Sequence, residues 1–395
     1  MRLKLCYVLP KYDLNTEEHF YHNYQFLEEL GKEVELFLII ERGVGEPQFK
    51  HMKKVYKQKF IGFLPLRILE IALLMLGMRM GGIKTFYVHY SYFGGLIGSL
   101  LCKLTGGKIY YWHCVSVIYK TKWAFNFQDL LHKVKAEVPL KLTLRVVDYL
   151  VTGTESLGDF YHQTFGIPKK KIIILPNEID LNRFNLERYD RRKIREKLGI
   201  NPEEKAVLFV HRVVERKGAH HLPEIAKKVN EEIPQAKFLV AGNGPYFETL
   251  KSKIAEAGLN SKVNLLGWVP NRKIMGLYAG ADVFIMPSEE EGFPRVLLES
   301  MAMGVPFVAT DVGGVRDICS EGQKKFIVPV KDNLSFAEKM ILLLQSQPIY
   351  EALKDEGLDH VQRFSSEKVK ERFMKEIMIK RENERRLRRR ERRSS

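Results

Sequence analysis

The sequence predicts an α/β protein built from two doubly wound domains, each with a parallel sheet covered by helices on both faces. Short apolar runs typical of buried strands alternate with helical patterns along most of the chain. This alternation occurs as two successive series. With 395 residues, of which 45% are hydrophobic and 11% aromatic, and a mean hydropathy of -0.21, the chain can fill two sizeable cores.

The first series predicts the domain 1–182. Its expected strands are 3–9, 33–40, 84–90, 108–112, 149–152 and 171–175. Its expected helices are near 17–30, 65–80, 95–105, 126–147 and 155–164.

The second series predicts the domain 183–364, beginning with a charged helix at 188–197. Its expected strands are 206–211, 236–241, 263–266, 282–286, 306–309 and 326–329. Its expected helices are 219–231, 246–257, 271–279, 294–303 and 334–346. A last helix at about 365–380 precedes a basic tail, 381–395, that we expect to be disordered.

The composition of the chain limits the classes of protein to which it can belong. Four scattered cysteines suit a reducing compartment and supply neither a disulfide framework nor a zinc site. The apolar run that ends at Pro10 is too brief for a signal peptide and suits a first strand. Residues 85–102 carry no charged side chain, but they divide into a strand and a helix. We therefore predict no transmembrane helix.

The segment 287–299 is the most informative part of the sequence. An apolar strand leads into a turn, and Pro294 suits the first helical position of the next helix, with Gly304 just past its end. The amino end of such a helix favours phosphate. Glu291 and Glu299 flank it, which suits a ligand with hydroxyls on both sides of a diphosphate, namely a nucleotide sugar. The helix dipole alone would equally favour a surface helix with an acidic start.

Two further loops follow predicted strands of the same domain. Arg212 and Lys217 follow strand 206–211 and could neutralise a diphosphate, although basic loops commonly only face solvent. A glycine turn, Gly242 to Pro245, follows strand 236–241. Ligands of open α/β sheets bind at the carboxyl ends of strands, so these loops are expected to lie near the Glu291 segment.

These motifs together resemble the donor domain of a GT-B glycosyltransferase of family 4. The matching positions are Arg212, Lys217-Gly218, Gly242 to Pro245, Glu291 to Phe293, Leu298 to Ala302 and Gly304 to Pro306. The resemblance implies two Rossmann-like domains facing a cleft, with the last helix returning to the first domain. It also implies metal-independent retaining transfer from a UDP- or GDP-sugar, with no cofactor.

The resemblance also assigns roles to residues. Arg212 and Lys217 would hold the diphosphate, Glu291 the donor sugar and Glu299 the ribose. Gly242, Gly244, Gly292, Phe293 and Val296 complete the expected donor site, with backbone amides near Phe293 and Val296 capping a phosphate. The expected catalytic set is Arg212, Lys217, Glu291 and His113.

His113 follows the predicted strand 108–112, where the family often has a histidine facing the donor sugar. Its implied role is to hydrogen-bond the sugar or orient the acceptor, not to act as a nucleophile. A histidine at the end of a strand is more commonly a packed or solvated residue, and that alternative stays open.

The chain departs from the family pattern at several positions. His211 stands where glycine is usual, which crowds the basic loop, and Pro294 replaces a frequent second glycine. Glu178 replaces the glycine of the linker motif. The loop after the first strand, 10–19, lacks the usual glycine pair, which leaves the mode of acceptor binding open.

The net charge of +16 is concentrated in part at the end of the chain, where residues 380–395 carry nine Lys or Arg against three Glu. Such a tail is either solvated or bound to anionic lipid, an attraction worth about 1 kcal/mol per basic residue. Nucleic acid would satisfy the same charges, but no nucleic-acid motif is present. Tyr119 to Phe127 interleaves aromatics with lysines, a pattern that favours bilayer headgroups, although a core helix with a basic outer face is equally consistent.

The predicted function is transfer of a hexose from a nucleotide sugar to a glycan, a lipid-linked glycan or a lipid at the inner face of the cell membrane, in the assembly of cell-surface polysaccharide or glycoconjugate. We expect a cytoplasmic, peripherally bound protein. Two other classes fit the same pattern: a nucleotide-sugar epimerase of the same fold, and a catalytically silent nucleotide-sugar-binding module.

Overall fold

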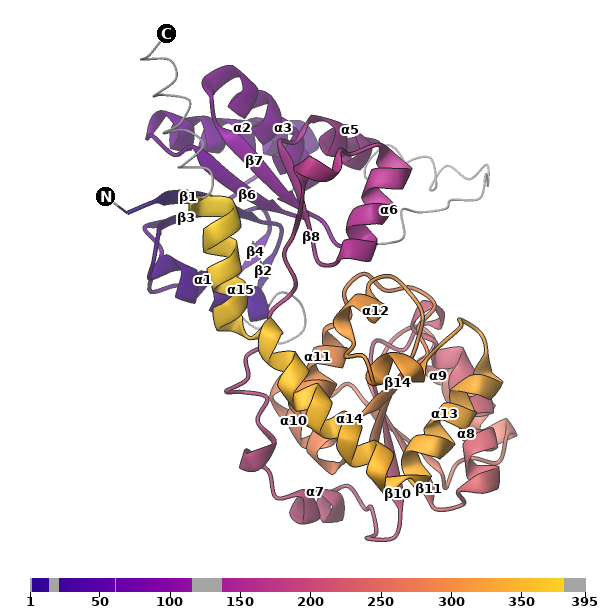
Figure 1. The fold of residues 1–395 in the computed structure, drawn as a ribbon. Helices are drawn as coiled ribbons and strands as arrows, with labels where there is room; N and C mark the ends of the chain where they lie inside the picture. Colours follow the sequence, from indigo (N-terminus) through magenta and orange to yellow (C-terminus); the bar gives the residue numbers. More distant parts are fainter. Residues whose placement is uncertain (1, 14–20, 61, 116–136, 380–395) are drawn as a thin grey trace, which may run out of the picture. The chain divides into compact units, whose positions relative to one another are not determined.

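The computed structural model describes residues 2–13, 21–60, 62–115 and 137–379 (Figure 1). The chain forms two compact units. One consists of Met1–Pro176 together with Glu367–Ser395, and the other is Asn177–Ser366. The chain thus passes into the second unit after Pro176, slightly before the boundary expected at 182/183.

Within the described residues, the first unit contains a seven-stranded sheet in the order β5-β3-β1-β6-β7-β8-β9, with every neighbouring pair parallel. Its strands are β1 (Lys4–Leu9), β3 (Glu35–Ile40), β5 (Lys54–Lys57), β6 (Thr85–His89), β7 (Lys108–Trp112), β8 (Tyr149–Thr152) and β9 (Ile172–Ile174). Two short strands, β2 (Tyr12–Asp13) and β4 (Gly43–Val44), pair beside it.

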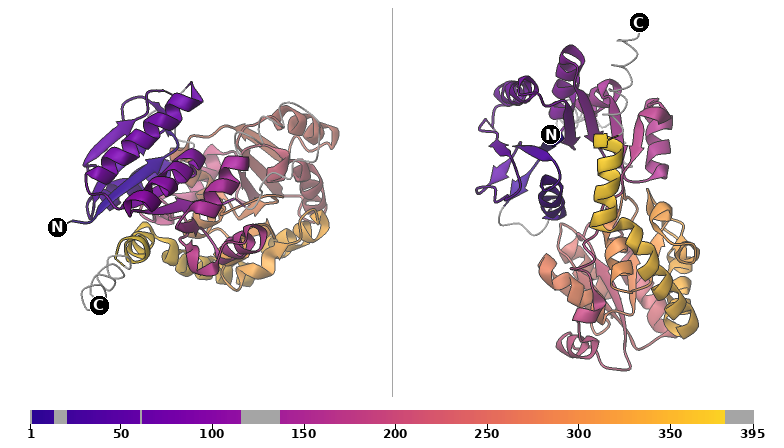
Figure 2. Two further views of the ribbon diagram at one scale, coloured as in Figure 1. Left: turned by 90° about the horizontal axis from the view of Figure 1, so that it is seen from above. Right: turned by 60° about the vertical axis from the view of Figure 1, so that its left-hand side comes forward.

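The helices of the first unit are α1 (Tyr21–Gly31), α2 (Leu64–Met80), α3 (Tyr92–Thr105), α5 (Val138–Val146), α6 (Glu155–Phe165), α15 (Ser366–Phe373) and the π-helical turn η8 (Met374–Ile379). Helices α2, α3 and α5 pack in series, and Figures 1 and 2 show α2 and α3 side by side. Helix α15 packs on this unit because the ring of Phe373 contacts those of Phe26 and Tyr87, and Lys370 lies 2.8 Å from Glu33.

The second unit contains, in its described residues, a six-stranded parallel sheet in the order β12-β11-β10-β13-β14-β15. Its strands are β10 (Lys205–Val210), β11 (Ala236–Ala241), β12 (Val263–Gly267), β13 (Val283–Met286), β14 (Phe307–Thr310) and β15 (Ile327–Val328). The strand order reverses between β10 and β13, so the loops that follow these two strands diverge to opposite faces. A crevice for ligands forms at such a point.

The helices of the second unit are α7 (Arg191–Lys197), α8 (Leu222–Glu232), α9 (Phe247–Glu256), α10 (Asn271–Gly280), α11 (Arg295–Ala302), α12 (Val315–Ile318), α13 (Asn333–Gln345) and α14 (Gln347–His360). Continuous apolar strands supply the core between them. Val207, Phe209 and Ile285 are fully buried and pack with Val229 of α8 and Met340 of α13.

The α/β fold class predicted from the sequence is confirmed. The predicted strands agree with the observed ones to within two residues at each end. The edge strand β5, the pair β2 and β4 and the helix α14 were not predicted. Pro294 is the N-cap of α11 rather than its first residue, and Gly304, with φ of 63°, lies just past the C-cap as expected.

The segment that enters the second unit lies beside the segment that leaves it. Ile179 N–H donates to the Phe364 carbonyl at 2.9 Å, and Ser366 N–H donates to the Ile179 carbonyl at 3.1 Å. The neighbouring Glu178 is buried and receives a hydrogen bond on its carbonyl from Arg295 at 2.6 Å; its carboxylate lies 3.6 Å from the same guanidinium. Arg295 begins α11, so this contact anchors the start of that helix to the linker.

Two further findings concern membrane-spanning helices and the reactivity of the cysteines. No helix in the described ranges combines the length and the low charge needed to cross a bilayer. The four cysteines, Cys6, Cys102, Cys114 and Cys319, are all buried. Burial raises the pKa of Cys114 and of Cys319 to about 12, so neither is a ready nucleophile.

Candidate functional site

The candidate site lies at the carboxyl ends of β10, β11, β13 and β14. The loop after β13 is held between its neighbours by backbone hydrogen bonds: Glu289 N–H donates to the Arg216 carbonyl at 3.0 Å, and Gly314 N–H donates to the Gly292 carbonyl at 3.0 Å. The basic loop and the glutamate loop come from the two strands at which the order of the sheet reverses. The chain therefore places its candidate ligand groups at the expected crevice.

Two glycines let these loops approach each other closely. Gly218 has φ of 75°, and a Cβ atom there would lie 1.9 Å from the Pro287 carbonyl oxygen. Gly242 has φ of 147°, and its Cβ would lie 1.8 Å from the His211 carbonyl oxygen. Any side chain at either position would force the backbones apart. The Gly242 turn thus supports the basic loop directly, and Gly244 approaches the Val213 carbonyl in the same way.

Lys217 and Glu291 form a buried ion pair. The Lys217 Nζ lies 2.7 Å from Glu291 Oε2 and also donates to the Glu290 carbonyl at 3.2 Å. The buried hydroxyl of Ser288 donates to Glu291 Oε1 at 2.9 Å. Only 8% of Glu291 and 7% of Lys217 is exposed, so the contact is little screened by solvent. The two residues that the sequence placed on the diphosphate and on the sugar are therefore in direct contact.

His211 completes this cluster, and its tautomer follows from its partners. The Arg212 backbone N–H donates to Nδ1 at 3.0 Å, so Nδ1 is an acceptor and Nε2 carries the hydrogen. Nε2 then donates to Glu291 Oε1 at 3.0 Å. Burial lowers the pKa of His211, which agrees with a neutral ring. Sequence reasoning treated His211 only as a crowded replacement for glycine and missed this role.

The ionisation states in the cluster follow from its contacts. Burial alone would raise the pKa of Glu291, but the hydrogen bond from His211 and the ion pair with Lys217 lower it. Because His211 is neutral, Lys217 is the main source of positive charge. Burial lowers the pKa of Lys217, and Glu291 opposes that shift. The cluster therefore holds a fixed carboxylate against a partly desolvated cation.

The other predicted donor residues surround this cluster without joining it. Arg212 is exposed beside His211. Phe293 is buried, with its ring 6.1 Å from that of Phe364, and Gly292 precedes it in the loop. Val296 lies in the first turn of α11, where backbone N–H groups lack helical acceptors.

Glu299 lies farther along α11 and has partners of its own. The Tyr278 hydroxyl lies 3.3 Å from Glu299 Oε2. Burial raises the pKa of Glu299, and the guanidinium groups of Arg295 and Arg183 partly offset this effect. Tyr278 and Arg295 were not predicted. The acidic pair of the sequence motif is thus split into two separate environments.

His113 belongs to the first unit and is 3% exposed. The Tyr161 hydroxyl donates to the Val115 carbonyl at 3.1 Å, so His113 Nδ1 is the donor in its own contact with that hydroxyl. Its ring stacks on Tyr111 at 5.9 Å. Burial lowers the pKa of His113 to about 3, and the ring is neutral. The proposed contact of His113 with a donor sugar stays a prediction.

This buried histidine predicts acid-sensitive stability. In the unfolded chain the imidazole binds a proton near pH 6.5, whereas in the folded chain it does so only near pH 3. The free energy of unfolding should therefore fall as the pH decreases below 6.5, by about 2 kcal/mol at pH 5 for this residue. Urea titrations at pH 7 and pH 5 should show a smaller loss for His113→Gln than for the parent protein. Equal losses in the two proteins would contradict the assignment.

A group that could ligate a metal ion occurs next to the site. In the described ranges, His220, His221 and Glu289 offer ligand atoms that lie within 4.8 Å of one another. Both imidazole Nε2 atoms contact Glu289 Oε1, at 3.1 and 3.2 Å. Lys331 lies 3.6 Å from the other carboxylate oxygen, so the geometry is also that of a network of ion pairs. The prediction that no metal is required stays a prediction.

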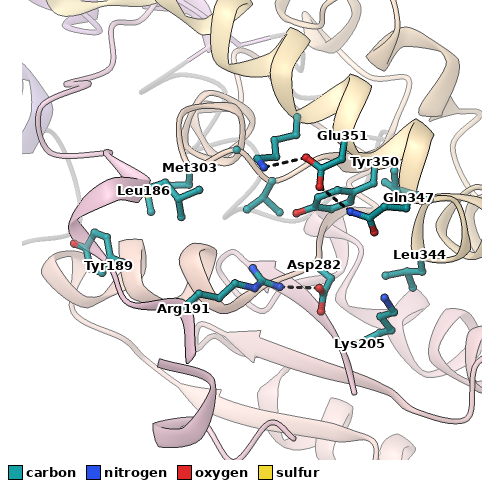
Figure 3. A pocket seen from close by; sticks show the side chains of 14 residues that line it. Leu186, Tyr189, Arg191, Lys205, Asp282, Met303, Leu344, Gln347, Tyr350 and Glu351 are labelled. Atoms are coloured by element: carbon teal, nitrogen blue, oxygen red, sulfur yellow. Dashed lines mark hydrogen bonds and ion pairs between the residues drawn. The ribbon is translucent and has the colours of Figure 1, made fainter. Parts of the chain in front are cut away.

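A pocket of about 360 Å³ lies elsewhere in the second unit (Figure 3). Its lining includes Lys205, Asp282 and Gly304, which come just before or at the amino ends of strands. Arg191 is part of the lining and lies 2.7 Å from Asp282. This pocket is therefore at the opposite edge of the sheet from the Lys217–Glu291 cluster and is not the predicted donor site.

Comparison with known proteins identifies the second unit. The family model for glycosyl transferases group 1 matches residues 190–360. This part of the chain is similar to that family. The match covers the Lys217–Glu291 cluster, Glu299 and the glycine turns, so the candidate site lies within the matched residues.

Relatives at the level of sequence are named as glycosyltransferases. An uncharacterized glycosyltransferase of Methanocaldococcus jannaschii is 33% identical over 43% of this chain and 44% of its own length. N-acetyl-alpha-D-glucosaminyl L-malate synthase of Bacillus anthracis is 30% identical over 51% of this chain and 52% of its own length. The chain thus matches about half the length of these curated relatives.

Solved structures show the fold over nearly the whole chain. The structure of Alr3699/HepE of Anabaena in complex with UDP-glucose has a TM-score of 0.73 and 16% identity, and the match covers 94% of this chain and 98% of that one. The predicted GT-B fold class is confirmed. Two predicted membrane contacts, Tyr119 to Phe127 and the tail 381–395, lie outside the described residues.

Proposed function

We propose that this protein is a retaining, metal-independent glycosyltransferase of family 4. It would move a sugar from a UDP- or GDP-sugar to a glycan, a lipid-linked glycan or a lipid at the cytoplasmic face of the membrane. The observation that carries the proposal is the buried Lys217–Glu291–His211 cluster at the crevice within the residues that match the family model. The glycosyltransferase names of its relatives and the UDP-glucose complex of a structural neighbour support it.

The donor would lie across the loops after β10 and β13. Lys217 and the exposed Arg212 would neutralise the diphosphate, and the first turn of α11 would add backbone N–H donors. Glu291 would accept hydrogen bonds from hydroxyl groups of the sugar. The Glu291 carboxylate is already held by contacts with His211, Ser288 and Lys217 in the absence of a ligand. Binding would therefore cost little side-chain entropy at this residue.

Transfer of the sugar would depend more on stabilising the negative charge of the departing diphosphate than on a strong base. When the bond between the anomeric carbon and the diphosphate breaks, the electron pair leaves with the phosphate oxygen. Lys217 and Arg212 would stabilise this developing charge, which is commonly the largest catalytic term. The acceptor hydroxyl would attack on the face from which the diphosphate departs, so the departing oxygen is placed to take its proton.

The basic character of the chain supports an acceptor at an anionic membrane surface. The net charge is +16, and residues 380–395 alone contribute nine Lys or Arg against three Glu. Attraction to anionic lipid is worth about 1 kcal/mol for each basic residue near the surface. Four buried cysteines suit the reducing interior of a cell.

Release of nucleoside diphosphate from a panel of UDP- and GDP-sugars, with and without a membrane lipid extract, tests the proposal. We expect release that depends on the extract. Arg212→Ala should weaken binding of the matching nucleotide by about tenfold, as expected for the loss of one charged contact. Lys273→Ala, which removes an exposed lysine of α10, is the matched control. Turnover of the donor without release of diphosphate would instead indicate an epimerase.

A further inference from the structure

Helix α2 of the first unit presents an apolar stripe to solvent. Leu66, Leu69, Leu73, Leu76 and Met80 are all exposed, and their spacing of three and four residues places them on one face. Leu73 is 59% exposed and Met80 is 81% exposed. We refer to these five side chains as the α2 stripe.

The opposite face of α2 is also apolar, and it already has partners. Ile71, Met75 and Met78 are buried within the first unit, and α2 packs along α3. The packing of the unit therefore accounts for one apolar face of this helix but not for the α2 stripe. Contiguous exposed apolar surface of this kind marks an interaction site more commonly than an ordinary surface.

The charged side chains of α2 are bound within the unit. Arg67 lies 2.8 Å from the buried carboxylate of Glu41. Glu70 accepts hydrogen bonds from the backbone N–H groups of Lys59 and Phe60 at 2.9 and 3.1 Å. Arg79 donates to the Thr105 carbonyl. Each of them is held by the fold, so the stripe itself carries no charge.

The helix that packs beside α2 also exposes apolar side chains, and α3 and α5 carry exposed cations. Leu100 and Leu104 of α3 are exposed, the latter by 88%. Lys103 precedes Leu104 and is exposed, as are Lys141 and Arg145 of α5, of which Lys141 also pairs with Glu137. From 59 to 108 the chain has six basic residues and one acidic residue, and Glu70, Arg67, Arg79 and Lys108 among them are bonded within the unit.

We propose that the α2 stripe, together with Leu100 and Leu104, docks the first unit on an anionic lipid bilayer. The leucines would enter the boundary between headgroups and acyl chains, and the exposed lysines and arginine of α3 and α5 would contact lipid phosphates. The three-four spacing would also suit a helix of a second copy. Self-association would bring the same cations together, so the charge favours an anionic bilayer.

The inference deepens the membrane part of the proposed function by naming the surface that makes contact. Helix α2 would lie along the bilayer rather than cross it, because its other face is buried in the unit. Its 17 residues span about 25 Å, which is enough for the whole stripe to reach the same lipid layer.

Sedimentation with vesicles of phosphatidylcholine, with and without phosphatidylglycerol, tests this surface in the full-length protein. We expect binding to the anionic vesicles and weakening by salt. Leu69→Gln/Leu73→Gln should lower the partition coefficient by about tenfold or more, as expected for two leucines that no longer enter lipid. Leu334→Gln/Leu342→Gln, which changes two exposed leucines of α13 in the second unit, is the matched control and should bind as the parent does.

Dye fluorescence provides a second test of the α2 stripe that does not require a variant with weaker binding to vesicles. All four native cysteines are buried, so an environment-sensitive dye on Leu73→Cys labels one site. Its emission should shift to the blue with anionic vesicles, whereas the same dye on Leu334→Cys should not respond.

Three outcomes would overturn the proposal. The first is that Leu69→Gln/Leu73→Gln binds anionic vesicles as strongly as the parent protein. The second is that the dye at position 73 shows no spectral shift. The third is that the protein forms a dimer which the leucine substitutions dissociate without changing its binding to vesicles. Binding of UDP and of GDP, measured in parallel, separates this inference from the proposed function. Its absence from the parent protein would count against the donor site alone and would leave the vesicle result standing.

Discussion

Replacing Lys217 with methionine is expected to lower the rate of transfer by about 10²- to 10³-fold. It should also weaken binding of UDP, or of GDP if the donor is a GDP-sugar, by about 10- to 100-fold. Methionine replaces the lysine side chain up to its last carbon and lacks only the ammonium group, so it removes the cation that faces Glu291 at 2.7 Å. It also leaves the Glu291 carboxylate buried without its positive partner, which costs about 3–5 kcal/mol of stability. Enzyme assay, UDP titration and urea unfolding measure the three effects.

The double variant Lys217→Met/Glu291→Gln separates the two roles of the lysine. Without the carboxylate no unpaired charge is buried, so most of the stability should return. The affinity for UDP should stay low, because the diphosphate would still lack its cation. Glu291→Gln alone, which changes the residue placed on the sugar, should bind UDP within a few-fold of the parent. If the double variant regained parental affinity for UDP, Lys217 would have only a structural role.

The second large effect is expected at Gly218. Alanine there would adopt φ of 75° and place its Cβ 1.9 Å from the Pro287 carbonyl oxygen. The loops after β10 and β13 would have to separate, which also moves Lys217 away from Glu291. We expect the free energy of unfolding of the second unit to fall by about 4 kcal/mol or more. UDP should no longer raise the melting temperature.

Gly199 provides the matched control for that substitution. It also has a positive φ, of 65°, but no atom lies within 4 Å of the position that its Cβ would take. Gly199→Ala should therefore show only the cost of the left-handed conformation, about 1–2 kcal/mol. Comparable losses at the two positions would show that the contact with Pro287 is unimportant.

Most of the fold was predictable because its strands are buried on both faces and read as continuous apolar runs. The strands that escaped prediction are the edge strand β5 and the separate short pair β2 and β4. Lys54–Lys57 forms β5 with a lysine at each end and only half-buried side chains, so it lacks that pattern. Helix α14 was missed because it is mostly polar and contains Gly357, which packs against Met301 of α11.

The candidate site was predictable in its residues but not in its pairings. Lys217 and Glu291 were identified from two loops far apart in the sequence, and the reversal of strand order brings these loops together. The sequence could not show that the cation would pair with the carboxylate, because a charge pattern does not give side-chain directions. His211 differs from the family glycine, and only the Arg212 amide and the Glu291 carboxylate on its two ring nitrogens reveal why.

The contact between Glu178 and Arg295 joins one departure from the family motifs to the start of α11. A glutamate replaces the linker glycine, and the guanidinium at the start of α11 neutralises it inside the protein. Loss of Arg295 would leave the Glu178 carboxylate without a cation in a poorly hydrated environment. Loss of the Glu178 side chain would keep the hydrogen bond from Arg295, because the acceptor of that bond is the backbone carbonyl. The backbone of the linker therefore holds the start of α11 in place, whereas the glutamate side chain makes the linker depend on the arginine.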